Sequence, residues 1–166
     1  MSGSRDAEYT EYVQSRLAWL RRVAYLLCQD WQSADDLVQC AITRLYANWG
    51  KARDAASIDA YTRTIMVRVF LAERRSAWYR RVILIDAPGD LPGFQHDHAV
   101  RMDVRTALAA LPPRQRATLV LRYYCDLSVE LTARELGCTP GTVKSQTARG
   151  LDALRRALGP IMAEEA

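Results

Sequence analysis

The sequence has no uninterrupted apolar run that approaches the ~20 residues needed to span a membrane, and its amino terminus has no apolar signal region. It also has no glycine-rich phosphate-binding loop and no converging acid and base motif of the kind that marks an active site. These absences argue against a membrane protein, a secreted protein and an enzyme. They make the cytoplasm the expected compartment.

Cysteine and histidine are scarce and widely spaced. The four cysteines form no Cys-x-x-Cys pair: Cys28, Cys40, Cys125 and Cys138. Only His96 and His98 could join them in holding a metal ion. We therefore expect reduced, mostly buried thiols, and neither a metal nor another cofactor.

The chain does contain enough apolar residues for real cores, at 49% of 166 residues, in one domain or two small ones. The net charge of +4 is mild, but the basic residues are unevenly spread. Six arginines lie between Tyr61 and Val82 against a single acid, Glu73: Arg63, Arg68, Arg74, Arg75, Arg80 and Arg81. Such a cluster is typical of nucleic-acid binding.

The stretch from Leu127 to Arg155 predicts two short helices that meet at a sharp turn. Ser128 can cap the first helix and Gly137 ends it. Thr139 and Pro140 then begin a second helix, with threonine as the N-cap and proline at the first helical position. We also expect Ala133 and Gly137 to let the two helices pack closely. This is the pattern of a helix-turn-helix, which binds duplex DNA.

The second helix of this motif turns Val143, Thr147 and Leu151 inward. Its outer face carries cationic and hydrogen-bonding residues: Thr142, Lys144, Ser145, Gln146 and Arg149. These residue types suit base edges and phosphates.

The rest of the chain has helical periodicity, which predicts an all-α fold of two small helical domains joined by a flexible linker. We expect helices over residues 9–29, from Ser33 through about Trp49, and over 58–81. Ser33 and Asp36 form a capping box at the start of the second helix. In the third helix, the residues expected to face inward include Ile65, Val69 and Ala72. Prolines and glycines at 88–93 mark the linker. The predicted divisions are a first lobe at 1–82, a linker at 83–101 and a second lobe at 102–166.

Three features together resemble the extracytoplasmic-function group of the sigma-70 family of transcription initiation factors. They are the segment SADDLVQCAITRLYANW, the arginine-rich third helix and the motif Gly141-Thr142-Val143-Lys144-Ser145. Their order is that of the family, with region 2 in the first lobe and region 4 in the second. The segment GTVKSQTARGL further resembles the actinobacterial SigE-like branch of that group.

The resemblance implies a non-catalytic subunit that joins core RNA polymerase, selects promoter DNA and aids its melting. Its partners would be a coiled coil of the largest polymerase subunit, the flap region of the second largest subunit and, in addition, an anti-sigma factor. The docking helix would contact the coiled coil through one set of residues: Asp35, Asp36, Leu37, Gln39, Thr43 and Arg44.

The resemblance also implies that the first lobe reads the downstream, minus-10 promoter element, with a pocket formed by the loop at 50–57 and the third helix. The residues expected there are Trp49, Lys51, Arg53, Tyr61, Arg63, Thr64, Arg68, Arg74 and Arg75. Trp49, Tyr61, Trp78 and Tyr79 are candidates for base stacking, against the alternative of core packing. The family often has an asparagine where this chain has Arg68, and arginine offers donors only, so Arg68 suits a guanine edge or a phosphate.

Two other interpretations fit parts of the chain. A plain helix-turn-helix regulator would explain the second lobe but leave the DDLVQ helix and the basic helix without a role. An interaction module that binds polymerase and blocks another factor would bind the core enzyme without starting transcription.

The second lobe would place the helix from Thr142 to Arg149 in the major groove of the upstream, minus-35 element. We expect Arg149→Ala to weaken binding to this element by ~1–3 kcal/mol if Arg149 contacts a base, as measured by titration of promoter duplexes. An equal loss on all promoter sequences would show that Arg149 contacts phosphate only.

Overall fold

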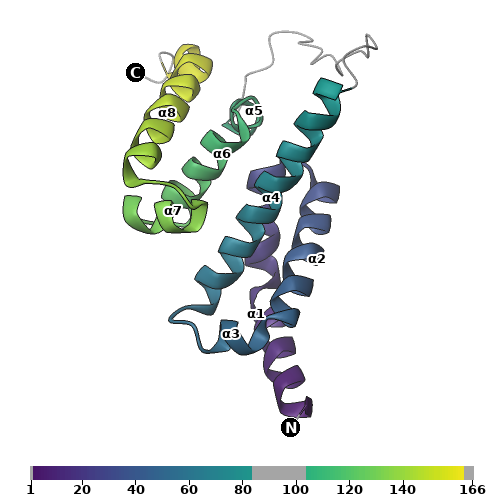
Figure 1. Cartoon of the computed structure of the whole chain (residues 1–166). Helices are drawn as coiled ribbons and strands as arrows, with labels where there is room; N and C mark the ends of the chain where they lie inside the picture. The colour runs from purple at the N-terminus through teal and green to yellow at the C-terminus, as the bar shows by residue number, and fades with distance from the viewer. Residues whose placement is uncertain (1, 84–103, 163–166) are drawn as a thin grey trace.

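The computed structural model describes the backbone of residues 2–83 and 104–162, and the side chains of residues 2–77 and 104–159. Every regular element in this part of the chain is helical, as predicted. The first lobe comprises α1 (Ser2–Cys28), α2 (Trp31–Ala47), α3 (Trp49–Arg53) and α4 (Ile58–Ile83). The second comprises α5 (Val104–Ala109), α6 (Pro113–Leu119), the π-helical turn η1 (Val120–Tyr124), α7 (Val129–Leu136) and α8 (Pro140–Met162). Figure 1 shows the two lobes side by side. The predicted linker, with His96 and His98, lies outside the described residues apart from Ile83.

The core of the first lobe lies where α1, α2 and α4 meet. The apolar stripe predicted for α2 is buried at Leu37, Val38, Ala41 and Leu45, whereas Tyr46 at its edge is 46% exposed. The helix predicted at 58–81 is α4, which buries Met66, Val67, Val69 and Phe70. Ala72, which was expected to face inward, is exposed. The side chains from Ala72 to Ala77 are all exposed, so the buried stripe of α4 does not continue over these residues.

The capping box predicted at Ser33 is wrong, because α2 begins two residues earlier, at Trp31. Asp30 is the N-cap, and its Oδ2 accepts a hydrogen bond from the backbone N–H of Ser33 at 2.8 Å. This backbone hydrogen bond, together with one from the Ser33 side chain, holds the pKa of the Asp30 carboxyl below its usual value. A carboxylate three residues before Ser33 takes the capping role that the sequence pattern had given to Ser33 itself.

The segment predicted as a loop at 50–57 begins with the short helix α3. Trp49, the first residue of α3, is only 2% exposed and lies in a small core with Leu45 and Ala52. Its indole ring packs against Tyr9 in a T-shaped arrangement and against Tyr12 at a tilt, with centroid separations of 5.6 and 5.8 Å. Trp49 therefore fixes α3 against α1, and the loop proper is confined to the residues before Ile58.

The helix-turn-helix has the caps that the sequence predicts. Ser128 Oγ accepts a hydrogen bond from the backbone N–H of Leu131 at 3.1 Å, and Thr139 Oγ1 accepts one from Thr142 at 3.1 Å. Gly137 has a left-handed backbone with φ of 66°. The N–H of Cys138 donates to the carbonyl of Ala133 and that of Gly137 to Arg134, which is the Schellman arrangement of a helix end.

Close helix packing in the second lobe depends on a glycine other than the one predicted. A Cβ added to Gly137 would meet no atom within 4 Å, so this glycine serves the left-handed turn alone. A Cβ on Gly150 in α8 would come within 2.9 Å of Leu119 Cδ1. Gly150 is the residue that lets α8 approach α6.

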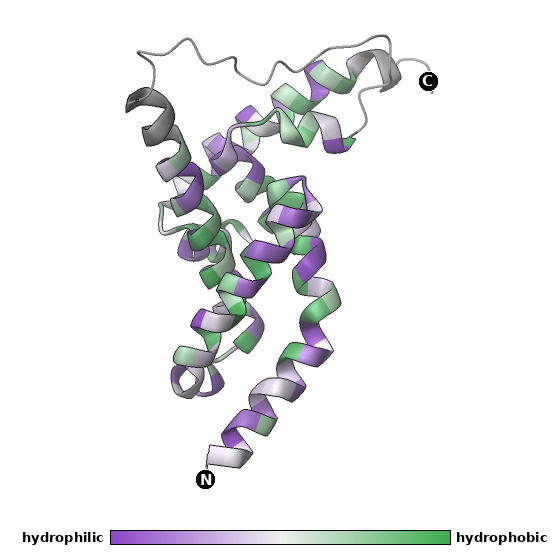
Figure 2. Cartoon of the chain, turned by 90° about the vertical axis from the view of Figure 1, so that its right-hand side faces the viewer, coloured by the Kyte–Doolittle hydropathy of each residue, from purple (hydrophilic) through white to green (hydrophobic). Residues whose placement is uncertain are grey.

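The two lobes pack against each other. α4 contacts α6 and α7, and α1 contacts α5, α6 and η1. Ala117, Val120, Leu121 and Leu136 of the second lobe belong to the same buried cluster as the core of the first. Figure 2 shows hydrophobic residues concentrated where the helices meet, whereas the free amino-terminal end of α1 is mostly hydrophilic.

Gly150→Val is expected to lower the free energy of unfolding by about 1–3 kcal/mol, because the added methyl groups would overlap Leu119. For a chain of this size the melting temperature should fall by roughly 2–12 °C, as measured by circular dichroism. Gly159→Val is the matched control, since this glycine of α8 is exposed and has open space around it. Equal melting temperatures for the two variants would contradict the proposed contact.

Candidate polymerase and promoter interfaces

The exposed face of α2 carries polar residues in a continuous strip. Asp35, Asp36, Gln39, Thr43 and Arg44 are all exposed, as the periodicity of the helix predicts. Asp35 accepts a hydrogen bond from Arg21 Nε of α1 at 2.8 Å, in an ion pair whose side chains are about half exposed. Leu37, by contrast, is 1% exposed and cannot contact a partner in this conformation, because it faces the core of the first lobe.

The residues predicted to read the downstream element divide into three groups by exposure. Lys51, Arg53, Arg68, Arg74 and Arg75 are exposed, although Arg53 also lies 3.4 Å from a carboxylate oxygen of Glu8. Tyr61, Arg63 and Thr64 are half-buried, and Trp49 is buried. The side chains of Trp78 and Tyr79 lie outside the described residues. Trp49 is a correction to the sequence prediction, because an indole enclosed by Tyr9 and Tyr12 presents no face on which a base could stack.

Arg63 forms an ion pair that joins the two lobes. Its Nη2 lies 2.7 Å from Oε1 of Glu135 on α7, and its Nε donates to both carboxylate oxygens at 3.1 and 3.2 Å. The side chains of Arg63 and Glu135 are only 12% and 7% exposed. Burial lowers the pKa of the Arg63 guanidinium, but the hydrogen bonds and charge of Glu135 outweigh it, so that the pKa is raised. Removing one partner of such a buried pair typically costs about 3–5 kcal/mol.

A groove of about 490 Å³ adjoins this ion pair and is walled by both lobes. Tyr61, Thr64 and Arg68 line it from α4, and Leu131, Arg134 and Glu135 line it from α7. The part of α4 predicted to read the downstream element thus faces the first helix of the helix-turn-helix.

The face of α8 that is predicted to read the upstream element is open to solvent. Lys144, Ser145 and Arg149 are exposed, and Thr142 and Gln146 are half-buried at its edges. Val143 on the opposite side is fully buried, and Thr147 and Leu151 are half-buried. The inward and outward residues of this helix therefore lie as the sequence predicts.

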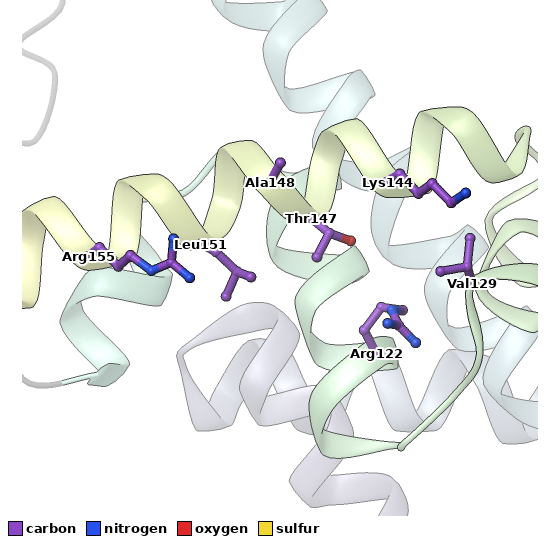
Figure 3. Close-up of a pocket in the computed structure, with 7 residues that line it drawn as sticks. All are labelled: Arg122, Val129, Lys144, Thr147, Ala148, Leu151 and Arg155. Atoms are coloured by element: carbon purple, nitrogen blue, oxygen red, sulfur yellow. The ribbon is translucent and has the colours of Figure 1, made fainter.

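A cationic groove of about 370 Å³ runs along one side of α8. Figure 3 shows Lys144, Thr147, Leu151 and Arg155 placed along the helix, with Arg122 of η1 opposite. Arg122 is also anchored, because its Nη1 donates to the carbonyl oxygen of Leu127. Arg122 and Arg155 were not among the predicted site residues, and they add two cations beside Lys144.

Arg116 of α6 is a second connection between the lobes that the sequence did not suggest. It is 6% exposed, and its Nη1 donates at 2.6 Å to the carbonyl oxygen of Leu27 at the end of α1. It also donates to carbonyl oxygens around the end of α5, those of Leu108, Ala109 and Leu111. Burial, and then the charge of Arg74, lower the pKa of Arg116 to about 10, so it remains charged at neutral pH.

Glu135 was also missed as a functional residue, although the sequence carried a signal for it. Leu131 and Glu135 are four residues apart and share a face of α7, and Leu131 is 45% exposed despite being apolar. An apolar and an acidic residue together on the outer side of a short helix indicate a contact with another element.

Other kinds of site are not found in the part of the chain that the structure describes. No group of three metal-ligating side chains occurs there, and no helix there is long and apolar enough to cross a membrane. The four cysteines are unpaired thiols, and burial raises the pKa of Cys28 and Cys125 to about 11 in each case.

Comparison with known proteins assigns both lobes. The family model described as Sigma-70 region 2 matches residues 12–80, and the model described as Sigma-70, region 4 matches residues 101–154. The RNA polymerase sigma-E factor of Streptomyces coelicolor is 38% identical over 157 residues, covering 91% of this chain and 86% of that protein. The ECF RNA polymerase sigma factor SigM of Mycobacterium tuberculosis is 31% identical over 140 residues, covering 84% and 71% respectively.

Among solved structures, the chain is similar to the sigma factor RpoE of Bartonella quintana, crystallised in complex with the anti-sigma factor NepR. The TM-score is 0.71 at 25% identity, and the match covers 92% of this chain and 97% of that chain. The fold, the polar face of α2, the helix-turn-helix and these relatives all indicate the same family. The chain belongs to the extracytoplasmic-function group of the sigma-70 family, and it is an alternative sigma factor that directs RNA polymerase to promoters.

Proposed function

We propose that this sigma factor uses three separate surfaces: α2 to dock on core polymerase, α4 to read the downstream element and α8 to read the upstream element. The observation that carries the proposal is the exposed polar strip of α2. A regulator that bound DNA alone would have no use for it. The proposed divisions are those of the sequence, with 1–82 for core binding and the downstream element, 83–101 as linker and 102–166 for the upstream element.

The α2 strip suits a basic helical partner, such as a coiled coil of the largest polymerase subunit. Asp35, Asp36 and Gln39 supply carboxylate and amide oxygens, and Thr43 and Arg44 continue the strip along the helix. Leu37 supports the strip from beneath by packing in the core. Its role is to hold the helix in place, and it makes no direct contact.

For the downstream element, the exposed arginines of α4 would hold the separated strand, and the surface of α4 beside Tyr61 and Thr64 would receive an unstacked base. Arg68 is exposed, so its guanidinium can reach a base edge or a phosphate. Lys51 and Arg53 add positive charge near the preceding loop. Trp49 supports α3 from within the core.

For the upstream element, α8 would enter the major groove with Lys144, Gln146 and Arg149 toward the bases. Thr142 and Ser145 would fix the amino terminus of the helix on the DNA backbone. The open exposure of Lys144, Ser145 and Arg149 supports this assignment.

Further partners follow from the family and not from this chain's own contacts. We propose the flap region of the second largest polymerase subunit as a contact of the second lobe, and an anti-sigma factor as a regulator. The similarity to an RpoE solved with the anti-sigma factor NepR supports the regulator. Acting as a non-catalytic subunit of the polymerase, the chain would work in the cytoplasm.

The double variant Asp36→Lys, Gln39→Lys is expected to weaken binding to core polymerase by roughly tenfold or more, because it reverses the charge of the proposed docking strip. Binding can be measured by fluorescence titration of the labelled chain with purified core enzyme. Glu11→Lys, at an exposed acid of α1 away from the strip, is the control and should bind normally. If both variants bind like the original chain, α2 is not the docking surface.

Run-off transcription with core polymerase on a promoter library tests the function and the role of Arg68 together. The chain should start transcription from a defined set of promoters, and Arg68→Asn should change the preferred base in the downstream element by a factor equivalent to about 1–3 kcal/mol. Arg75→Asn, an exposed arginine of the same helix, should lower transcription from all promoters alike. A uniform loss for Arg68→Asn would show a phosphate contact, and no transcription at all would favour a module that only blocks other factors.

A further inference from the structure

An exposed tryptophan extends the polar strip of α2 at its amino-terminal end. Trp31 is the first residue of α2 and is 47% exposed. Residues four apart share a face of a helix, so Trp31 lies in line with Asp35, Gln39 and Thr43 of the strip. Tryptophan is one of the residue types that most often anchor a protein interface. Trp31 therefore belongs to the same surface as the strip, although its side chain is aromatic.

The indole of Trp31 is held in place by α1. Tyr25 of α1 stacks on it, with ring centres 4.2 Å apart and an angle of 20° between the planes. The guanidinium of Arg21, also on α1, lies 5.1 Å from the centre of the indole ring. Because the stacked side chain is already ordered, a partner that contacts it loses less conformational entropy on binding. Trp31 is thus both exposed and preorganised.

Arg21 connects this indole to the carboxylate of Asp35. Nε of Arg21 donates to Oδ1 of Asp35 at 2.8 Å, and Nη2 donates to Oδ2 at 3.4 Å. One guanidinium therefore contacts both an aromatic ring and a carboxylate, and each of these groups attracts a cation. Trp31 and Asp35 together form a site for one cationic side chain, and Arg21 fills that site in the free chain.

The contact made by Arg21 is open enough to be exchanged. The side chains of Arg21 and Asp35 are 45% and 52% exposed, and an ion pair so open to water contributes little to stability. A basic partner can bring its own arginine or lysine to the site while Asp36 and Gln39 bind neighbouring groups. The displaced guanidinium of Arg21 would return to water, where it is well solvated.

We propose that Trp31 and Asp35 form a cation-binding site within the docking surface, in which Arg21 stands in for an arginine or lysine of core polymerase. On docking, the polymerase side chain takes the place of Arg21. This inference rests on the proposed docking of α2 on a basic helical partner, and the site is continuous with that strip at Asp35. It makes Trp31 a direct contact of the polymerase and Arg21 a competitor that weakens the complex.

Trp31→Leu in the full chain tests the site, because leucine keeps an apolar side chain and removes the aromatic face. The affinity for core polymerase should fall roughly tenfold in a fluorescence titration of the labelled chain. The melting temperature should change little, because Trp31 is exposed. Tyr123→Leu, at an aromatic residue of η1 that is 57% exposed, is the matched control and should bind normally. Unchanged affinity for Trp31→Leu would overturn the proposal.

Arg21→Ala distinguishes an exchangeable site from a purely structural cluster. Removing the competitor should raise the affinity for core polymerase severalfold, because the site is then vacant in every molecule. Arg22→Ala removes the neighbouring exposed arginine of α1 and controls for the loss of one positive charge, so its effect should be much smaller. A lower affinity for Arg21→Ala, or a gain no larger than that of Arg22→Ala, would contradict the exchange.

The unmodified chain offers a measurement that depends on no variant. Hydroxyl radicals oxidise exposed indole rings, and the products can be located by mass spectrometry. Oxidation of Trp31 should slow severalfold when core polymerase binds, because a partner side chain then covers the ring. Trp49 is buried in the first lobe and provides the internal reference. If Trp31 is oxidised equally fast in the free and bound chains, the polymerase does not occupy this site.

Variants of the strip separate this inference from the function on which it rests. If Asp36→Lys, Gln39→Lys weakens binding to core polymerase and Trp31→Leu does not, the cation site is wrong while α2 remains the docking surface. If neither change weakens binding, the docking role of α2 fails as well.

Discussion

The packing of α4 on two sides is the constraint on which the rest of the structure depends. Met66, Val67, Val69 and Phe70 are buried, and α4 contacts α1 and α2 within its own lobe and α6 and α7 of the other. The second lobe completes this core, so its position is set by the burial of apolar surface and is not left to the linker. The same helix carries the arginines proposed to hold DNA. Stability of the packed form and access to the downstream-reading face are therefore opposed.

The charged contacts make this apolar packing specific. A purely apolar interface would tolerate sliding, whereas Arg63 with Glu135 and Arg116 with Leu27 each require one alignment of the lobes. Both arginines remain charged at neutral pH, and Arg63 would be left buried without its partner if Glu135 alone moved away. We therefore expect the ion pair and the apolar contacts between the lobes to be lost together when the lobes separate.

Local signals predicted the fold and the outer faces well. The caps at Ser128, Gly137 and Thr139 and the exposed residues of α2 and α8 follow from spacing within a few residues. Long-range contacts could not be predicted this way, because Arg63 and Glu135 are 72 residues apart and either pattern alone looks like a solvated face. Trp49 was misjudged for a related reason, since its enclosing residues, Tyr9 and Tyr12, lie far earlier in the chain. The cap at Ser33 failed because Asp30 competes for the same N–H group.

The distance between α2 and α8 in the free chain and in the open promoter complex is the most direct measure of whether the contact between α4 and α7 is kept when promoter DNA is bound. Spin or fluorescent labels on exposed positions of these two helices would report it. We expect one short distance in the free chain and a longer one when the chain is bound to polymerase and promoter DNA. The same short distance in both states would contradict an account in which the packing of α7 on α4 limits access to the downstream-reading face.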